Sequence, residues 1–341
     1  MQNTVLFFGG SSDERLVSTA SAQNLCQQYG FTKIWFLTKS GSVHEIQKAD
    51  LLQHADAFTQ EFSPKAGTQI ASTLKEAMPS LKNHIVFMGF HGTEGENGEM
   101  QALLEEFRIP FTGSGSQASR DCFDKVRAKK TVAAAGIKTT DELSVNPKSA
   151  ESFEALRAFF KRHSKIVLKP TANGSSIGLF IVDSESVLEN AIKEISKKPE
   201  TPYLAEKFIV GRECTIGILQ TPQGHQALPA SEVIMQSGRN FDYSGKYLGQ
   251  GSTEITPAEV KPEQMKALQE VSMKAHKALN CYGYTRTDVI LCANDEIIYL
   301  ETNTLPGLTK ASFIPQQLAE AKINMTDFIE LQLRWALERY N

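Results

Sequence analysis

Apolar and polar positions alternate in blocks along the first third of the chain. Three short apolar runs predict buried strands, and two other stretches repeat apolar residues with helical spacing. The second helical stretch stops before Pro110, as expected for a helix end. Strands that alternate with helices predict a small parallel α/β domain over residues 1–115. The predicted strands cover 4–8, 33–37 and 84–90, and the predicted helices cover 14–29 and 98–107.

The remaining two thirds of the chain mix both patterns and predict an α+β organisation. A long helical pattern over 116–135 ends at Gly136, a common helix stop, and begins a new unit. The interval 237–254 has no regular pattern, and its length favours a functional lid over a passive connector. Two helices are predicted to finish the chain. Further strands are predicted at 165–169, 179–182, 203–208, 214–219, 231–236, 284–291 and 296–301, and helices at 149–163, 187–197 and 265–279.

Composition narrows the class of protein. The chain has 341 residues, 41% of them hydrophobic and 22% charged, which is typical of a soluble globular protein of about two domains, with three small ones as the alternative. A net charge of -3 gives no global basis for binding nucleic acid or an anionic membrane. No apolar segment is long enough to cross a bilayer, and the N-terminus lacks the features of a signal peptide. The five cysteines are odd in number, widely spaced and free of C-x-x-C pairs, which fits reduced thiols in a cytoplasm. We expect the protein to stay in that compartment.

Two glycine-rich turns follow predicted strands in the first domain. Residues 9–14 lie where the N-terminus of a helix attracts anions. Alternatively, Glu14 could bind the ammonium group of a substrate. A plain turn with an acidic first helical turn remains open for this segment. Residues 91–98 are expected to face a substrate, because open parallel sheets bind ligands at this edge. A metal site made by His91, Glu94 and Glu96 is the weaker alternative, since the spacing is not that of two ligands on a helix face.

A lysine and a Gly/Ser loop follow the strand predicted at 165–169. The segment 169–178 could close over phosphates with backbone amides and hydroxyls, although it lacks the ending of a P-loop. A hairpin turn of small residues is the alternative. Within the predicted lid, residues 241–247 include Lys246, which could reach a transferring phosphoryl group when the lid closes.

Charged residues also end two predicted strands near the C-terminus. Arg286 and Asp288 share one face by alternation, and Glu301 and Asn303 share a face of the next strand. If the strands pair, two carboxylates and an amide oxygen converge, which are ligands that Mg²⁺ accepts beside nucleotide phosphates. The guanidinium beside them could stabilise an oxyanion. A surface salt bridge on a polar sheet face is the alternative.

Taken together and in this order, these segments resemble the D-alanine–D-alanine ligases of the ATP-grasp superfamily. The resemblance implies a three-domain ATP-grasp architecture of α/β and α+β class: an N-terminal parallel α/β domain (1–115), a central subdomain (116–208) and a C-terminal subdomain (209–341) that carries the lid loop 237–254. The active site is then expected at their junction. The matching segments are GGSSDERLVS at 9–18, HGTEGENG at 91–98, FTGSG at 111–115, DKVRAK at 124–129, KPTANGSSIG at 169–178, EKFIVGRE at 206–213, FDYSGKY at 241–247, RTDV at 286–289 and ETNTLPGLTKASFIP at 301–315.

The resemblance also implies a role for each site residue. ATP is the expected cofactor, together with two Mg²⁺ or Mn²⁺ ions held by Asp288, Glu301 and Asn303. Lys125 and Lys169 are implied to contact the phosphates of ATP. Glu206, Lys207 and Ile209 are implied to line the adenine pocket, and Glu213 to contact the ribose. Ser176 and Phe208 are also implied to bind ATP. Glu14 is implied to bind the ammonium of the first D-alanine, and Arg286 and the Gly307 amide are implied to stabilise the oxyanion. Ser312 is implied to bind the carboxylate of the second D-alanine, and Lys246 to reach the γ-phosphate. His91 and Phe313 are implied to contact substrate. Ser175 and Tyr247 are implied to link the Gly/Ser loop, the lid and Glu14.

The implied reaction joins two D-alanine molecules through an acyl phosphate, for peptidoglycan precursors. D-alanine and ATP are then the expected small-molecule partners of a homodimer that binds neither nucleic acid nor membrane. Two positions depart from the family pattern: Asn97 stands where aspartate is usual, and Phe313 stands where leucine is usual. Because Phe313 is implied to border the second subsite, a ligase with another acceptor such as D-serine stays open. A nucleotide-binding protein without activity is the remaining alternative.

Overall fold

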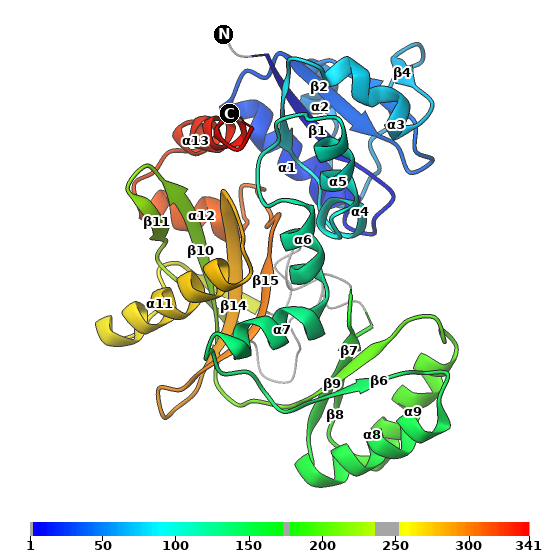
Figure 1. Ribbon diagram of the computed structural model, residues 1–341, viewed down its shortest axis with the longest axis vertical. Helices are drawn as coiled ribbons and strands as arrows, with labels where there is room; N and C mark the ends of the chain where they lie inside the picture. The colour runs from blue at the N-terminus through cyan, green and yellow to red at the C-terminus, as the bar shows by residue number, and fades with distance from the viewer. Residues whose placement is uncertain (1–2, 173–177, 236–251, 341) are drawn as a thin grey trace.

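The computed structural model describes residues 3–172, 178–235 and 252–340 (Figure 1). Three separate β-sheets organise these residues, each with its own helices. The mixed α/β class predicted from the sequence is confirmed. Within the described ranges, no helix has the length and apolar character needed to cross a membrane.

The first sheet has the strand order β4-β3-β2-β1-β5. Its centre is parallel as predicted: β1 (Thr4–Gly9) lies between β2 (Lys33–Leu37) and β5 (Ile85–Met88), and all three are almost fully buried. The prediction missed the two antiparallel strands on one side of this sheet, β3 (Val43–Glu45) and β4 (Gln69–Ala71), because three residues carry too little pattern. The helices of this unit are α1 (Arg15–Gln28), α2 (Lys48–Gln53), α3 (Leu74–Ala77), a 3-10 turn (Met78–Leu81), α4 (Thr93–Glu96) and α5 (Glu99–Glu106).

The single helix predicted over 116–135 is wrong, because the structure divides it at Asp124. The Asp124 carboxylate accepts the N–H groups of Val126 and Arg127 at 3.0 and 3.1 Å and so caps a new helix. This break places Lys125 at the start of the second helix, on the side of the candidate site. The two helices are α6 (Ser116–Phe123) and α7 (Lys125–Ala134).

The second sheet is antiparallel, with the order β6-β9-β7-β8, and forms the lower unit of Figure 1. Two amphipathic helices pack their buried faces on it, each begun by a serine that caps the first turn. Apolar residues of the strands and helices form a core of their own, so this unit has an independent interior. Its elements are β6 (Glu142–Val145), α8 (Ala150–His163), β7 (Ile166–Pro170), β8 (Phe180–Val182), α9 (Glu185–Ser196) and β9 (Tyr203–Lys207).

The third sheet has the order β13-β12-β10-β14-β15, with β11 paired to β10. A hairpin at one end of this order joins β14 (Tyr284–Leu291) to β15 (Ile297–Asn303), two strands that the sequence predicted. The last residues of the predicted lid form β13, and residues 237–251 of it lie outside the described ranges. The other elements are β10 (Arg212–Thr221), β11 (Gly224–Ala227), β12 (Ser231–Met235), β13 (Ser252–Ile255), α11 (Pro262–Ala278), α12 (Phe313–Glu320) and α13 (Met325–Glu338).

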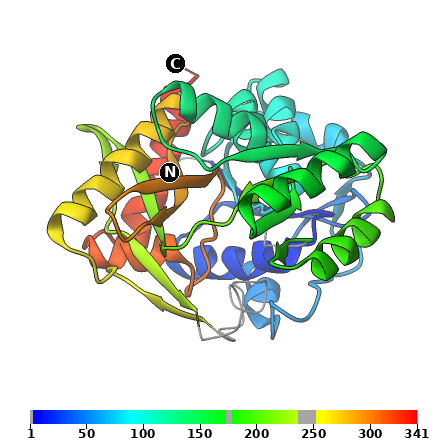
Figure 2. The same cartoon turned by 90° about the horizontal axis from the view of Figure 1, so that it is seen from below.

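The first and third sheets are joined by a common core. Leu25 of α1 and Phe87 of β5 belong to the same apolar cluster as Leu318 of α12 and Phe328 of α13. Figure 1 shows α13 beside the first sheet, and Figure 2 shows the same helices from below. This shared core fixes the carboxyl ends of β1 and β5 against the end of β15, where the candidate site lies.

Candidate active site

A single hollow lies where the carboxyl ends of β1 and β5 meet the hairpin β14–β15 and the start of α12. Such a position, outside the carboxyl ends of parallel strands, is the usual ligand site of open α/β sheets. Half of the residues predicted from the sequence meet here, although they come from segments up to 299 positions apart. They are Glu14, His91, Glu213, Arg286, Asp288, Glu301, Asn303, Gly307, Ser312 and Phe313.

One side of the hollow, which we call the strand wall, consists of four charged or amide side chains on β14 and β15. The register sets Arg286 opposite Asn303 and Asp288 opposite Glu301, as predicted from alternation and pairing. The Arg286 guanidinium donates to both Asp288 oxygens, at 2.9 and 2.8 Å, in a forked pair. Asn303 Nδ2 donates to the same carboxylate at 3.3 Å. Thr215 of β10 donates to Asp288 as well.

The strand wall offers the oxygen ligands that a hard divalent cation requires. Asp288 and Glu301 supply carboxylates and Asn303 an amide, and Lys125 Nζ lies 3.2 Å from Glu301 Oε2. No three His, Cys, Asp or Glu side chains gather into a metal-like group in the described part of the chain. Two carboxylates and one amide fill only part of the coordination shell of such a cation, so the donor set fits one that also takes oxygens from a phosphate.

The opposite side, which we call the loop wall, consists of the three segments 9–14, 91–98 and 304–309. Two of them touch closely: a Cβ on Gly92, whose φ is +76°, would lie 2.0 Å from Ser12 Oγ and 2.9 Å from Glu14 Oε2. Ser12 Oγ accepts the backbone N–H of Glu14 at 3.0 Å. Only glycine at position 92 allows this approach, so the turn holds the buried Glu14 carboxylate toward the hollow.

The acidic residues of 91–98 hold the turn against the segment 9–14. Glu94 accepts from the backbone and hydroxyl of Ser11. Glu96 Oε1 accepts the Gly92 N–H at 3.1 Å, and burial together with the neighbouring Glu14 charge raises the pKa of Glu96 to about 8. Asn97 Oδ1 accepts the N–H of Glu99 at 2.9 Å, at the start of α5.

His91 is buried and both of its ring nitrogens are engaged by the protein. Nδ1 lies 2.9 Å from the Leu305 carbonyl, and Nε2 lies 2.8 Å from Ser21 Oγ. Burial lowers the pKa of His91, so the neutral ring predominates. Its nitrogens therefore join the loop wall to α1, and a substrate would meet the ring edge.

The start of α12 closes the hollow beside the third loop segment. A Cβ on Gly307 would lie 2.7 Å from Ser312 Oγ, so the two residues are in close contact. Ser312 Oγ is 2.7 Å from Thr309 Oγ1 and accepts the Thr309 N–H at 3.2 Å. Phe313 is the first residue of α12, and the Arg286 guanidinium carbon lies 5.7 Å from its ring centroid. The aromatic ring thus lies beside the predicted oxyanion group.

A second charged cluster lies on β7, β9 and α7, close to the first. Lys169 Nζ is 2.6 Å from Glu206 Oε2, and Lys129 Nζ contacts the other oxygen of Glu206. Lys129 and Glu206 are both buried. Lys125, predicted at the phosphates, lies one turn before Lys129 and borders a smaller hollow that shares Glu301 and Asn303 with the first. Cationic groups therefore converge beside the strand wall.

The other residues predicted on the ATP side follow β9. The Lys207 side chain is exposed, and its backbone N–H donates to the Asp141 carbonyl at 3.0 Å. Lys165 Nζ lies 4.0 Å over the ring of Phe208, and Ile209 is half-buried. These three residues do not line the hollow described above. Ser175, Ser176, Lys246 and Tyr247 lie outside the described residues.

The sequence did not reveal several residues that belong to the site. Thr215, Glu254 and Lys129 were not singled out, although the first two line the hollow and the third pairs with Glu206. Burial raises the pKa of Glu254, whose carboxylate accepts from Gln316 at 3.1 Å. Only Lys129 carried a signal, because it follows Lys125 by four positions on one helix face.

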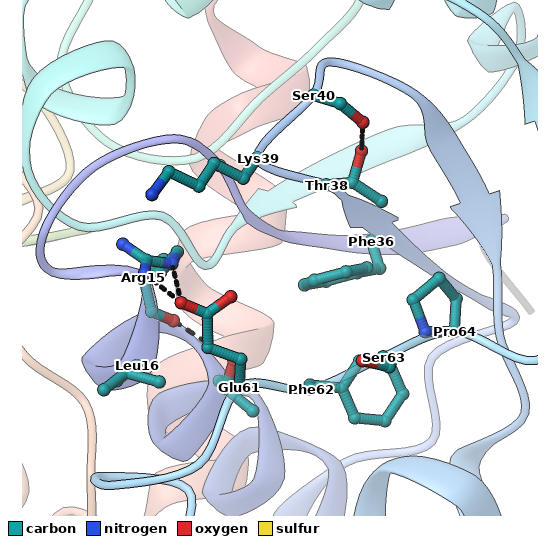
Figure 3. A pocket seen from close by; sticks show the side chains of 12 residues that line it. Arg15, Leu16, Phe36, Thr38, Lys39, Ser40, Glu61, Phe62, Ser63 and Pro64 are labelled. Carbon is teal, nitrogen blue, oxygen red and sulfur yellow. Dashed lines mark hydrogen bonds and ion pairs between the residues drawn. The ribbon is translucent and has the colours of Figure 1, made fainter.

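A separate hollow lies on the other side of the segment 9–14, at the carboxyl end of β2 (Figure 3). Arg15, Lys39 and Glu61 point into it, and none of the predicted site residues lines it. Arg15 pairs with Glu61 and donates to the Ser12 carbonyl at 3.0 Å. This pair supports the backbone of the loop wall from behind.

Comparison with known proteins agrees with this arrangement. The family model described as D-ala D-ala ligase N-terminus matches residues 3–114, and the D-ala D-ala ligase C-terminus model matches 132–333. A D-alanine--D-alanine ligase of Leptospira interrogans (serovar Lai) is 33% identical over 99% of this chain and 100% of its own. The D-alanine-D-alanine ligase structure from Coxiella burnetii has a TM-score of 0.80 at 23% identity, covering 99% and 94% of the two chains.

A related structure carries a different acceptor in its name. The VanG D-Ala:D-Ser ligase from Enterococcus faecalis has a TM-score of 0.79 at 26% identity, with 99% of both chains covered. The fold is therefore that of the ATP-grasp ligases. Both family models together account for most of the sequence, and the chain belongs to the D-alanine–D-alanine ligase family.

Proposed function

We propose that the protein joins two D-alanine molecules into D-alanyl-D-alanine at the expense of ATP, for peptidoglycan precursors. The observation that carries this proposal is the single hollow that unites Glu14 with Arg286, Gly307 and the carboxylates of the strand wall. An acid for an ammonium, donors for an oxyanion and oxygens for a cation are the groups that this reaction requires.

In the first step, a carboxylate oxygen of the first D-alanine attacks the γ-phosphorus of ATP, and ADP leaves. Glu14 binds the ammonium of this D-alanine, and its burial strengthens the pairing. Lys125 and Lys169 offset charge on the phosphates, with Glu206, Lys207, Phe208, Ile209 and Glu213 around the nucleoside. Asp288, Glu301 and Asn303 would hold Mg²⁺ or Mn²⁺, two ions in our proposal, which supplies charge neutralisation on the transferred phosphoryl group.

In the second step, the amine of the second D-alanine attacks the acyl carbon and loses a proton, and phosphate leaves. Negative charge develops on the carbonyl oxygen, and Arg286 with the Gly307 N–H stabilises it. Asp288 holds the guanidinium by two hydrogen bonds, so Arg286 needs no rearrangement at that moment. Ser312 binds the second carboxylate at the start of α12, where backbone N–H groups favour an anion.

A closed lid protects the acyl phosphate from water in this proposal. Lys246 reaches the γ-phosphate, Ser176 binds on the ATP side, and Ser175 and Tyr247 link the Gly/Ser loop, the lid and Glu14. We also propose a cytoplasmic homodimer with domains at 1–115, 116–208 and 209–341. The five free thiols, four of them buried, support a reducing compartment.

A second candidate is the same reaction with another acceptor, such as D-serine. Two observations favour it: Phe313 lines the hollow beside Arg286, and the VanG D-Ala:D-Ser ligase shares the fold at 26% identity. A phosphate-release screen over D-amino acids and D-lactate, with product identified by mass spectrometry, separates the two. D-alanine alone should release phosphate and yield dipeptide. If release requires D-serine, the second candidate replaces the first, and if no amino acid promotes release, the ligase activity is rejected.

A further inference from the structure

The segment that carries Gly307 has no regular secondary structure of its own. It leaves β15 after Asn303 and reaches α12 at Phe313, and Leu305, Pro306 and Gly307 line the hollow. A backbone N–H stabilises an oxyanion only when its direction is fixed before the reaction. The Gly307 N–H therefore depends on contacts that hold this segment in place.

Helix α1 of the first sheet supplies the anchors. Ser21 Oγ accepts the Leu308 N–H at 3.3 Å, and Asn24 Nδ2 donates to the Leu308 carbonyl at 2.8 Å. Both backbone groups of Leu308 are thus bound by one helix turn. On the other side of Gly307, the Leu305 carbonyl is bound by His91, which itself contacts Ser21. Gly307 therefore lies between Leu305 and Leu308, whose backbone groups are held by hydrogen bonds.

The directions of these hydrogen bonds are settled by the chemistry of each partner. A carbonyl only accepts, so His91 Nδ1 donates to Leu305. The neutral ring then accepts at Nε2, and the Ser21 hydroxyl donates its one proton there. That leaves a lone pair of Ser21 for the Leu308 N–H. Each group in this chain is satisfied, and Ser21 is its centre.

Burial makes the arrangement stiff. Ser21 is fully buried, and Leu308 places its side chain in the apolar core that also contains Leu25 of α1. A buried polar group that loses its hydrogen-bond partner is destabilised, so displacement of the segment is opposed. The close contact of Gly307 with Ser312 restricts it from the other side.

We propose that Ser21 and Asn24 are positioning residues that orient the Gly307 N–H for the second chemical step. This inference rests on the proposed function, in which Gly307 stabilises the oxyanion. Neither side chain lines the hollow, so neither contacts substrate. The proposal predicts that their loss slows attack on the acyl phosphate and leaves its formation largely intact.

The test uses two variants with matched controls on the same helix. Ser21→Ala is matched by Ser18→Ala, since Ser18 is equally buried and its hydroxyl bridges Gly9 and Gly89 instead. Asn24→Asp is matched by Gln23→Glu, because the half-buried Gln23 amide donates to carbonyls beside α2. Asn24 and Gln23 are only half-buried, so Asn24→Asp and Gln23→Glu keep the test available if Ser21→Ala and Ser18→Ala fold poorly.

The rate of the first step is measured as the D-alanine-dependent scrambling of ¹⁸O between the bridging and non-bridging positions of ATP. The rate of the whole reaction is measured as dipeptide formation. In Ser21→Ala and Asn24→Asp, the ratio of the rate of dipeptide formation to the rate of scrambling should fall about tenfold. This is a smaller effect than removal of an oxyanion donor itself. The KM for ATP should not change. In the two controls the ratio should equal that of the wild type.

Two results would overturn the inference. If both rates fall together in Ser21→Ala and Asn24→Asp, the residues contribute only to stability. If the ratio falls equally in the controls, the effect belongs to α1 in general. A wild-type protein that forms no dipeptide at all would instead reject the proposed function, so the two failures are distinguishable.

Discussion

The strand wall and the loop wall face each other across one hollow but are held by different forces. On the strand wall, charges pair directly: the Arg286 fork on Asp288 and the contact of Lys125 with Glu301. On the loop wall, neutral hydrogen bonds and close backbone contacts dominate, as at His91 and Gly92. Charged pairs suit the binding of phosphate and cation, whereas the loop wall must hold an amide and a carboxylate in fixed directions.

The difference has a consequence for mutations. A change on the strand wall leaves buried charge unbalanced and removes a group that acts on the reacting phosphate. A change on the loop wall shifts backbone position, and the cost is distributed between stability and substrate affinity. Three variants, at Glu301, Gly92 and Asn97, test that division, and His276 tests stability away from both walls; the expected effects run from the largest to the smallest.

Glu301→Gln should have the largest effect and should concern activity. The amide keeps the size of the side chain but removes a charge from the proposed cation site and from Lys125. We expect kcat to fall about 10²–10³-fold, as for loss of one electrostatic contact to a transition state. Binding of Mn²⁺, followed by electron paramagnetic resonance with ATP present, should weaken as well.

The matched control is Glu296→Gln on the same hairpin, where the carboxylate pairs with Lys138 at the surface. It should keep full activity and Mn²⁺ binding. If Glu301→Gln retains wild-type Mn²⁺ affinity while activity falls, the carboxylate acts through Lys125 and not through a cation.

Gly92→Ala should have the next largest effect and should act on stability and donor binding together. The new Cβ would meet Ser12 Oγ at 2.0 Å, and φ of +76° is unfavourable for alanine. We expect the free energy of unfolding to fall by about 3 kcal/mol, the sum of strain and clash. The KM for the first D-alanine should rise, because Ser12 and Glu14 must move.

Gly41→Ala separates the two contributions. Its φ is +93°, yet a Cβ there would meet nothing within 4 Å. Urea unfolding should show a smaller loss of about 1 kcal/mol from backbone strain alone, with an unchanged KM. Equal losses in both variants would mean that the loop wall tolerates the clash.

The two walls also differ in how far the sequence could predict them. Alternation placed Arg286 and Asp288 on one face, and the hairpin placed Glu301 and Asn303 opposite, because β-strand geometry is local. The helix break at Asp124 was equally local but was missed, since a capping aspartate also fits a continuous helix pattern. The loop wall depends on pairs such as Ser21 with Leu308, 287 positions apart, for which a single sequence carries no signal.

Acid stability should depend on a histidine away from both walls. His276 of α11 is fully buried against Thr285, and burial lowers its pKa to about 3. Between pH 6.5 and 3 the unfolded chain binds a proton that the folded chain does not, so the free energy of unfolding falls as the pH drops. At pH 5 this loss is about 2 kcal/mol.

Urea midpoints of wild type and His276→Gln at pH 7.5 and pH 5 measure this contribution. The variant should lose less stability between the two pH values than the wild type. An identical loss in both would show that His276 does not account for the acid sensitivity.

Asn97→Asp should have the smallest effect, although it restores the residue usual in the family. Asn97 Oδ1 already accepts the Glu99 N–H, and its side chain does not line the hollow. A carboxylate can accept the same N–H at the start of α5, where the helix dipole favours negative charge by about 0.3–1 kcal/mol. We therefore expect a small gain in stability and a change in kcat/KM below about threefold, or ~0.7 kcal/mol of barrier.

Asn97→Ala, which removes the acceptor, should instead cost about 1 kcal/mol of stability. A tenfold change in kcat/KM for Asn97→Asp would show that added charge on the loop wall governs the donor site, and the contrast between a strand wall held by ion pairs and a loop wall held by hydrogen bonds and close contacts would then fail.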